Sequence, residues 1–309
     1  MTLQERFGQI LADVRGGGTA QHTLTAEGAV YVRRFCPRER LILLGCGHVS
    51  QALCGYGADL GFSVIAADDR PSFANRARFP SAEQVLCDSF ENAIRTLDIG
   101  ETDYVAILTR GHRYDADCLR AILPGPFPRY LGMIGSKRRV EGLKELLTEE
   151  GFDPALLARL HAPIGLPIQA LTLPEIAIAI AAELIQCRRA DSGRLRRSEA
   201  LTEEGYSLPL LEFLAEDPTP KALITVCETA GSTPVKSGAM MAVDALNRTV
   251  GTVGGGCGEA QLLQIARRVI GTGTRRLVTV SMTNDVAAQA GMVCGGEMKV
   301  MIEDGGADV

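Results

Sequence analysis

The sequence predicts an α/β fold in which a doubly wound parallel sheet is followed by a smaller α+β domain. Its 309 residues suffice for two domains, and 46% hydrophobic with 22% charged residues is typical of a globular chain. From Arg40 onward, short apolar runs alternate with glycine turns and helical segments, which is typical of parallel sheets. Beyond residue 220 the pattern becomes several strands around one amphipathic helix. These observations predict two domains of different architecture.

The first 37 residues are expected to form a separate N-terminal extension. Apolar residues recur at helical spacing and predict a short helix that ends at the glycines of 16–18. Residues 22–34 alternate around Glu27-Gly28 and predict a β-hairpin. The apolar positions of the helix are Phe7, Ile10, Leu11 and Val14.

Residues 38–190 are predicted to form the parallel-sheet domain. Its expected strands are 41–44, 64–67, 85–87, 105–108 and 130–134. Thr172 to Glu175 has the pattern of a capping box and predicts the start of a helix that runs to about Cys187. A linker is expected over 191–220, because the arginine-rich stretch 188–205 offers almost nothing to bury and favours a solvated segment over a binding patch.

Residues 221–309 are predicted to form the second domain. The amphipathic stretch 261–270 predicts its helix. Its expected strands are 223–226, 239–243, 250–253, 277–280 and 298–302.

Composition narrows the classes of function. A net charge of −5 and the absence of tryptophan argue against nucleic-acid binding. No apolar run approaches the ~20 residues of a membrane span, and the start lacks the apolar run of a signal peptide. Nine cysteines without a Cys-x-x-Cys pair indicate free thiols in a reducing compartment. We therefore expect a cytoplasmic protein that binds neither nucleic acid nor membranes.

Gly45-Cys-Gly47-His48-Val-Ser50 follows the first predicted strand and opens a helix. In the Rossmann dinucleotide fingerprint the first glycine makes a tight turn and the second admits a pyrophosphate at the helix N-terminus. Ser50 replaces the third glycine, which departs from the strict pattern. Gly45, Gly47 and His48 are therefore candidate cofactor-binding residues. The alternative is a tight turn without a nucleotide.

Asp68-Asp69-Arg70 ends the second predicted strand, where a ribose 2′-hydroxyl is normally held. We interpret Asp69 as a ribose ligand and Arg70 as a possible partner of a 2′-phosphate.

Two further loops follow later strands of the same sheet. Arg110 is expected to bind the cofactor, and His112, with Asp115 nearby, is a candidate for proton transfer or phosphate binding. The alternative is a helix-capping loop. In Gly135-Ser136-Lys137-Arg138-Arg139, Ser136 is the expected N-cap, so three cations begin a helix. The helix dipole disfavours them there, which indicates either full solvation or a bound anion. We favour the anion, with Gly135, Ser136, Lys137 and Arg138 as its ligands.

The second domain holds two cysteines set in glycine. Cys257 follows Gly254-Gly255-Gly256, and Cys294 precedes a glycine pair. A thiol at a helix N-terminus favours thiolate, the nucleophilic and metal-binding form. Cys257, Cys294 and Glu259 are therefore candidate catalytic residues, and the three glycines are candidate cofactor contacts. The alternative is that both thiols are small packing residues at tight turns.

These motifs together resemble the xanthine dehydrogenase accessory factor family (XdhC/CoxI), over about residues 38–303. The domain order is the reverse of the commoner arrangement in that family. The carrying motifs are L-L-G-C-G-H-V, D-D-R-P, L-G-M-I-G-S-K-R, H-A-P-I-G-L-P-I (161–168), the helix that contains Glu183, and both cysteine clusters.

The resemblance implies a chaperone that binds molybdenum cofactor (molybdopterin), supports its sulfuration and delivers it to an apo molybdenum hydroxylase of the xanthine dehydrogenase type. It also implies a cysteine desulfurase as sulfur source and a homodimer, with Cys257 and Cys294 contacting molybdenum or sulfur. Members often carry basic residues where this chain has Val235 and Met240; Lys236 supplies one nearby charge. The competing hypothesis is an NAD(P)-dependent oxidoreductase that uses His112 as acid and base.

Overall fold

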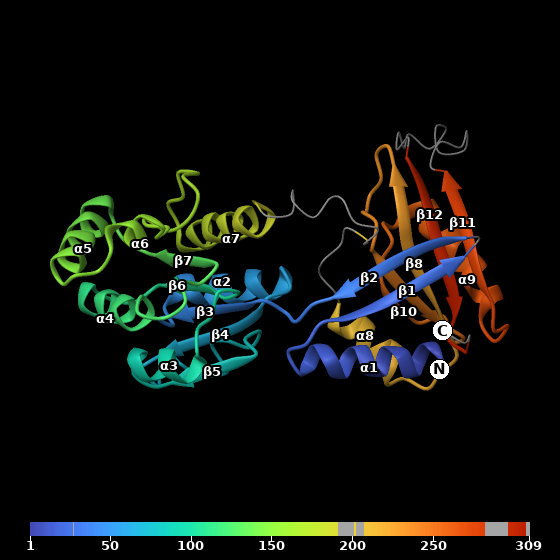
Figure 1. The fold of residues 1–309 in the computed structure, drawn as a ribbon, viewed down its shortest axis with the longest axis horizontal. Coiled ribbons are helices and arrows are strands. Elements are labelled where there is room, and N and C mark those ends of the chain that lie inside the picture. The colour runs from blue at the N-terminus through green and yellow to red at the C-terminus, as the bar shows by residue number, and fades with distance from the viewer. Residues whose placement is uncertain (27, 191–200, 202–206, 282–295, 307–309) are drawn as a thin grey trace. The chain divides into compact units, whose positions relative to one another are not determined.

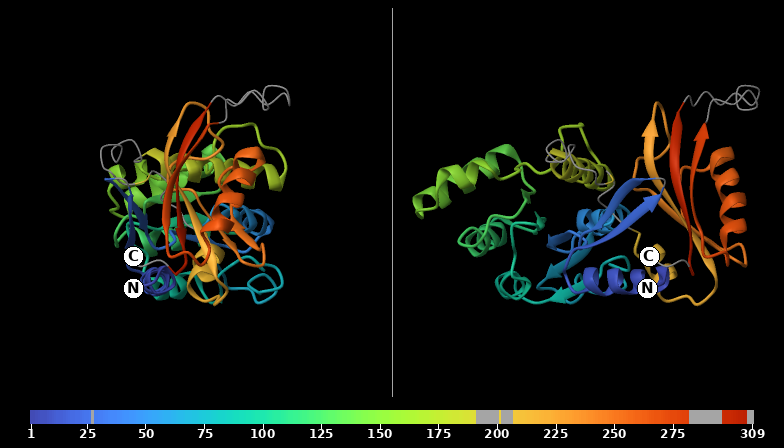
Figure 2. Two further views of the ribbon diagram at one scale, coloured as in Figure 1. Left: turned by 90° about the vertical axis from the view of Figure 1, so that its right-hand side faces the viewer. Right: turned by 45° about the vertical axis from the view of Figure 1, so that its right-hand side comes forward.

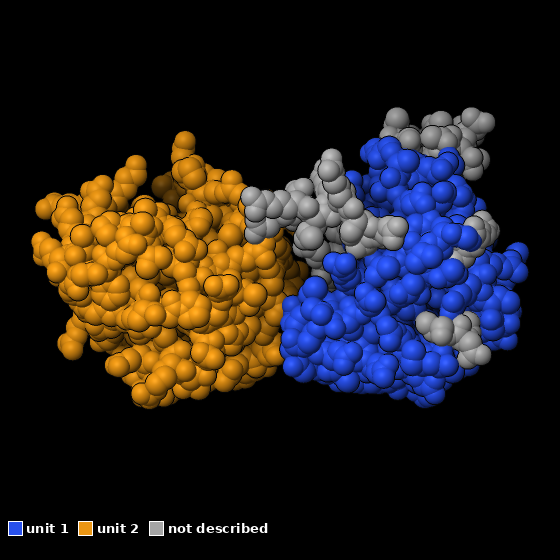
Figure 3. Space-filling model, in the orientation of Figure 1, with its two compact units in different colours: residues 1–37, 196–309 blue, residues 38–195 orange. Residues whose placement is uncertain are grey.

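The computed structural model describes residues 1–26, 28–190, 201, 207–281 and 296–306 (Figure 1). The chain divides into two compact units, shown in different colours in Figure 3. Unit 1 comprises Met1–Pro37 and Arg196–Val309, and unit 2 comprises Arg38–Leu195. Among the described residues no helix has the length and apolar character needed to cross a bilayer.

Unit 2 contains the predicted parallel sheet. Its strands lie in the order β5-β4-β3-β6-β7, and every pair is parallel. This is the doubly wound order of the Rossmann fold, so the predicted fold class is confirmed. The strands are β3 (Arg40–Leu44), β4 (Ser63–Asp68), β5 (Gln84–Cys87), β6 (Tyr104–Ile107) and β7 (Tyr130–Met133).

Helices cover both faces of this sheet, which is why its strands are apolar on both sides. Leu41 and Leu43 pack toward α2 (His48–Asp59) and α7 (Leu173–Ala190). Ile42 and Leu44 pack on the opposite face. That face is covered by α3 (Phe90–Leu97), α4 (His112–Ile122), α5 (Lys137–Glu149) and α6 (Pro154–Ala158).

The predicted capping box before α7 is confirmed. The Thr172 backbone N–H donates to the Glu175 carboxylate at 3.0 Å, and the Glu175 N–H donates to the Thr172 hydroxyl at 3.4 Å. This reciprocal pair satisfies donors that the first helical turn leaves open.

Unit 1 is built on an antiparallel sheet in the order β10-β9-β8-β12-β11 (Figures 1 and 2). Successive residues of β8 alternate, so that Ile224 packs against α9 (Gly256–Val269) and Leu223 packs on the opposite face. The strands are β8 (Lys221–Ala230), β9 (Met240–Asp244), β10 (Thr249–Gly251), β11 (Arg275–Ser281) and β12 (Glu297–Asp304).

The first 37 residues belong to unit 1 and do not stand apart as the expected extension. The helix α1 (Leu3–Arg15) buries Phe7 and Ile10 against one face of the sheet, and the hairpin of β1 (Ala20–Ala26) and β2 (Ala29–Phe35) lies on the same face. The sequence predicted the helix and the hairpin but not the sheet on which they pack. An amphipathic pattern shows that one face is buried but does not identify the element that buries it.

Two other expectations are corrected in unit 1. Part of the expected linker is the helix α8 (Leu208–Ala215), which begins at the N-cap Ser207 and buries three leucines beside α1. The predicted helix of 261–270 begins earlier, at Gly256. Its first turn is rich in glycine, so the apolar periodicity used to predict the helix starts only in the second turn.

Candidate functional site

The ligand crevice of a doubly wound sheet lies outside the carboxyl ends of the strands, where the strand order reverses. In unit 2 that point lies between β3 and β6. The loops after these two strands hold Gly45 to Gly47 and Thr109 to Gly111, so the fold brings together two motifs that sequence analysis singled out.

The glycine turn has the geometry expected of the fingerprint. Gly45 has a φ of +106°, and a Cβ there would lie 2.4 Å from the Leu108 carbonyl oxygen, so only glycine fits. The Ser50 hydroxyl donates to the Gly45 carbonyl and is fully buried, which suits the close packing required in the third place. Gly47 is the N-cap of α2, with no side-chain cap and no atom within 4 Å of its Cβ position. The approach to this helix end is therefore open.

Asp68 is turned into the protein. Its carboxylate accepts the Cys46 backbone N–H at 2.8 Å and is held by the Arg70 guanidinium at 2.8 and 2.9 Å. Asp68 is fully buried, so it braces the glycine turn. Arg70, expected to meet a 2′-phosphate, is instead engaged by Asp68 and lies over the Phe73 ring.

Asp69 forms a bidentate ion pair with Arg110, at 2.5 and 2.8 Å. The Arg110 guanidinium lowers the pKa of Asp69 to about 2, so the carboxylate is ionised. Asp69 follows β4 and Arg110 follows β6, and β3 lies between these strands. The pair therefore crosses the carboxyl end of β3, beside the glycine turn. A ribose hydroxyl would have to share Asp69 with this arginine.

His112 is exposed at the first position of α4, and this helix has no side-chain cap. The carboxylate expected beside it, Asp115, is fully buried and accepts from the Thr109 hydroxyl at 2.5 Å and from Arg139. Burial raises the pKa of Asp115 despite these partners. Asp115 is thus engaged by other groups, and the role of His112 in proton transfer stays a prediction.

Ser136 is the N-cap of α5, as predicted, and accepts the Arg139 backbone N–H at 3.3 Å. Of the three cations that follow it, Arg139 is paired with Asp115. Lys137 and Arg138 are exposed and form no ion pair with any described residue. The chain itself thus supplies an anion for one of the three cations.

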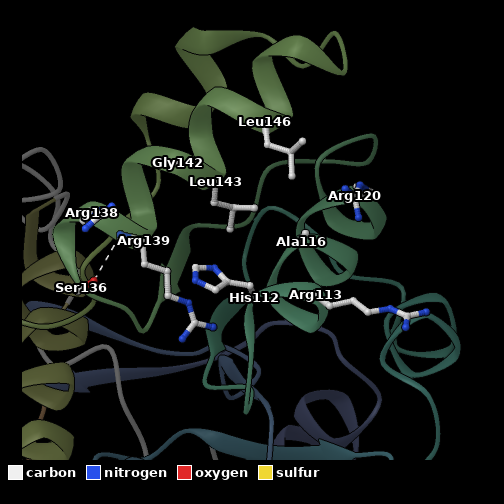
Figure 4. A pocket seen from close by; sticks show the side chains of 10 residues that line it. All are labelled: His112, Arg113, Ala116, Arg120, Ser136, Arg138, Arg139, Gly142, Leu143 and Leu146. Atoms are coloured by element: carbon white, nitrogen blue, oxygen red, sulfur yellow. Dashed lines mark hydrogen bonds between the residues drawn. The ribbon is translucent and has the colours of Figure 1, made fainter.

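A groove of about 600 Å³ lies between α4 and α5 (Figure 4). Sequence analysis named His112, Ser136, Arg138 and Arg139 but missed the rest of its lining. Those residues face one another only because β6 and β7 are neighbours and bring the two helices together. The missed lining residues are Arg113, Ala116, Arg120, Gly142, Leu143 and Leu146.

In unit 1, a glycine turn leads into α9. Gly254, Gly255 and Gly256 have φ angles of +114°, +70° and +68°, which favour glycine. A Cβ at Gly254 would lie 2.3 Å from Pro234, whereas nothing lies within 4 Å of that position at Gly255 or Gly256. Cys257 follows as the second residue of α9 and is exposed. This turn therefore presents a thiol and open backbone together.

Glu259 organises this turn. One carboxylate oxygen accepts from the Thr252 hydroxyl at 2.6 Å and from the backbone N–H groups of Val253 and Gly255, at 2.9 and 3.0 Å. Burial alone would raise the pKa of Glu259, but these hydrogen bonds outweigh it and the pKa is lowered. The geometry gives this residue a structural role, and its candidate role in proton transfer stays a prediction.

Gly296, the last residue of the second cysteine motif, lies against a neighbouring loop of unit 1. A Cβ at Gly296 would lie 2.3 Å from the Ser232 carbonyl oxygen, in the loop whose Pro234 packs on Gly254. Gly254 and Gly296 therefore both contact the loop of 231–236. Cys294 lies outside the described residues. In the part of the chain that is described, no group of three or more His, Cys, Asp or Glu side chains is placed to hold a metal ion.

Each of the two units contains a match to a known protein-family model. Residues 41–184 match the XdhC Rossmann domain, and residues 214–281 match the XdhC and CoxI family. The chain belongs to this family.

Two curated proteins are related to this chain. An uncharacterized protein of Escherichia coli, YqeB, is 35% identical over 54% of this chain and 30% of its own length. A Bacillus subtilis protein that is named as a probable xanthine dehydrogenase subunit is 31% identical over 52% of this chain and 46% of its own length. The match thus spans less than half of each relative. A crystal structure described as a xanthine dehydrogenase from Bacillus halodurans is 31% identical over 54% of this chain and 47% of that chain, with a TM-score of 0.48.

The family motif of residues 161–168 connects β7, the edge strand of the Rossmann sheet, to α7. The Glu183 carboxylate accepts from the Tyr130 hydroxyl at 2.6 Å and the Gly165 N–H at 2.8 Å, and contacts the His161 ring nitrogen at 3.2 Å. Burial would raise the pKa of Glu183, but these partners lower it. We interpret this hydrogen-bonded cluster as structural, because it holds α7 against the edge of the sheet.

Met240, where members of the XdhC and CoxI family often carry a basic residue, is only 8% exposed. It packs in one cluster with the apolar residues of α1 and α8. A charge at this position would be buried in this chain. An apolar residue at this position is therefore consistent with the apolar side chains of α1 that pack against it.

Proposed function

We propose that this chain is a maturation factor for a xanthine dehydrogenase-type molybdenum hydroxylase, and that it binds molybdenum cofactor at the turn that bears Cys257. Family membership in both units supports this role, and so does the name of the Bacillus subtilis relative. The single observation that carries the site is the exposed Cys257 thiol on an open glycine turn at the start of α9.

The residues of this turn fit such a cargo. Thiolates are preferred ligands of soft metals and nucleophiles toward sulfur, and the unpaired N–H groups of a helix start favour anions. Open space at Gly255 and Gly256 lets a ligand approach the main chain closely. We propose that Cys257, together with Cys294, holds the cofactor while it acquires sulfur from a cysteine desulfurase. Transfer to the apo-hydroxylase follows, and the chain acts as a homodimer.

The test is to purify the chain without oxygen and identify any released pterin by mass spectrometry. The C257A/C294A double variant should lose the pterin and fail to support hydroxylase activity in cells that lack the native copy. The matched control is C36A/C87A, which removes two other thiols, both of them exposed, but leaves the glycine turns intact. Pterin-free wild-type protein combined with full activity of C257A/C294A would refute the proposal.

An NAD(P)-dependent oxidoreductase is the second candidate, favoured by the strand order and by the open helix end at Gly47. The engagement of Asp68 by the turn and of Asp69 by Arg110 weighs against it, because the usual ribose ligand is occupied. Calorimetric titration with NADH and NADPH decides between the two: absence of binding at millimolar cofactor eliminates the oxidoreductase.

A further inference from the structure

The segment that ends in α7 carries most of the exposed large apolar side chains of unit 2. Nine such residues are exposed in the described part of the chain, and five of them lie between residues 168 and 185. Single exposed apolar residues are ordinary, whereas a group of them in one segment is typical of an interaction surface. The five are Ile168, Leu171, Leu173, Ile178 and Ile185.

An apolar hollow lies beside this surface, between α7 and α2. Its volume is about 280 Å³, and of the described residues that line it Asp59 alone is charged. Tyr56 and Leu60 of α2 line one side, and Ile178 and Ile185 of α7 line the other. Hollows between two packed helices are the places where side chains of a facing helix insert.

The exposed side of α7 has the spacing of a helix that packs on another helix. Five of its residues, which we call the α7 stripe, follow one another at steps of three, four, three and four: Glu175, Ile178, Ala182, Ile185 and Arg189. This spacing keeps all five on one side of the helix. Ala182 is half-buried and the other four are exposed. The small residue at the centre lets a second helix approach closely.

The α7 stripe is complementary to itself when its direction is reversed. Glu175 lies seven residues before Ala182 and Arg189 lies seven residues after it. In a two-fold interface, residue i contacts residue j of the partner and residue j contacts residue i. An antiparallel pair of α7 helices would therefore bring each acid to an arginine and each isoleucine to an isoleucine. This pattern of charges favours a second copy of the chain over an unrelated partner.

Both charged ends of the stripe can make this contact. Arg189 is exposed in the last turn of α7. The backbone N–H groups of Thr172 and Leu171 both donate to the same oxygen of Glu175, Oε2, at 3.0 and 2.7 Å. The other carboxylate oxygen can therefore accept from a guanidinium. These two bonds lower the pKa of Glu175, so its carboxylate is ionised at neutral pH.

We propose that the α7 stripe pairs antiparallel with the α7 stripe of a second copy of this chain. Ile178 and Ile185 enter the hollow between α7 and α2 of the partner, and Glu175 forms an ion pair with the partner's Arg189. This inference rests on the homodimer of the proposed function, and it names the surface that forms it.

The first test is sedimentation velocity of the full chain over a series of concentrations. We expect reversible dimerisation of the wild type, and I178E/I185E should weaken it by roughly a hundredfold or more, because buried apolar anchors carry most of the affinity of an interface. Glutamate is a good helix former, so this variant is expected to fold normally, which circular dichroism checks. The matched control is V30E/L246E, which replaces two exposed apolar residues of unit 1 and should dimerise like the wild type.

The charged ends of the stripe test the antiparallel direction. R189E and E175R should each weaken the dimer by roughly fivefold to tenfold, because like charges then face each other across the interface. An equimolar mixture of the two variants should regain the affinity of the wild type as a heterodimer, in which both contacts again join opposite charges. Native mass spectrometry identifies this heterodimer by its mass. The matched control is R268E, which reverses an exposed arginine in the last turn of α9 and should leave dimerisation unchanged.

Three results would overturn the inference. They are a wild type that stays monomeric at every concentration, unchanged dimerisation of I178E/I185E, and no gain in affinity on mixing R189E with E175R. A dimer that survives I178E/I185E refutes the α7 surface but leaves the homodimer of the proposed function standing. The pterin analysis is read separately from dimerisation, so failure of the proposed cofactor site is recognisable without this experiment.

Discussion

Each of the two glycine turns of the molecule holds a cysteine at the start of a helix and is hydrogen-bonded to a carboxylate. The two turns differ in whether the thiol is exposed. In unit 2, Cys46 lies between Gly45 and Gly47 and is fully buried, and burial raises its pKa to about 12. In unit 1, Cys257 follows three glycines and is exposed. The same residue types therefore hide one thiol and present the other.

The difference follows from where the bracing carboxylate comes from. Asp68 reaches the Cys46 N–H from the neighbouring strand, 22 residues further along the chain. This hydrogen bond holds the turn of Gly45 to Gly47 against the sheet. Glu259 reaches the Gly255 N–H from only four residues away, so the second turn is organised within itself and projects from the helix start. In this chain the turn held from the neighbouring strand is buried, and the turn held by its own helix is accessible.

The largest expected effect is on the buried turn. G45A should destabilise unit 2 by more than about 4 kcal/mol, because the new Cβ meets backbone at an unfavourable φ. The clash lies at 2.4 Å from the Leu108 carbonyl oxygen. G47A is the matched control, since Gly47 has an ordinary φ of −71° and open space; we expect a cost of about 1 kcal/mol or less. Urea unfolding followed by circular dichroism measures both. Equal destabilisation by the two variants would contradict this account of the turn.

The next effect is on thiol reactivity. Native protein treated with iodoacetamide should be modified at Cys257 roughly a thousand times faster than at Cys46, because the thiolate reacts and burial suppresses it. Mass spectrometry of the labelled peptides gives the two rates. In urea the rates should become similar, which is the internal control. Rapid labelling of Cys46 in the folded protein would remove the distinction between the turns.

The smallest effect concerns the local brace. E259Q should cost about 1–2 kcal/mol at pH 7, because hydrogen bonds to a charged acceptor become bonds to a neutral one. The pKa of Glu259 is lowered in the folded state, so its contribution is present above the unfolded pKa of about 4.3 and is lost as pH falls through the folded value. Wild type and E259Q should therefore converge in urea midpoint as the pH falls below the folded pKa of Glu259. A difference that stays unchanged from pH 7 to strongly acidic pH would show that the carboxylate charge is irrelevant.

Much of the fold was predictable from local patterns. The alternation of apolar runs and glycine turns predicted the five parallel strands, and Thr172 with Glu175 predicted the start of α7. The start of α9 was predicted late, because its glycines carry no apolar periodicity. The helix α8 was missed, because its four leucines follow a long polar stretch.

The candidate site was less predictable. Sequence placed Cys257 at a helix start, and the structure agrees. It did not reveal that Asp68 turns inward, that Asp69 pairs with Arg110, or that Asp115 of α4 pairs with Arg139 of α5.

The order of elements, the positions of the glycine turns and the family all follow from the linear sequence. These depend on periodicity, on turn chemistry and on caps that act within a few residues. Folding in three dimensions sets which thiol is buried, which carboxylate is already paired and which cations have no ion-pair partner among the described residues. It also places the first helix against the sheet of the last domain. Those outcomes depend on side-chain directions and on neighbours brought together by strand order, and a linear pattern of residue types contains neither.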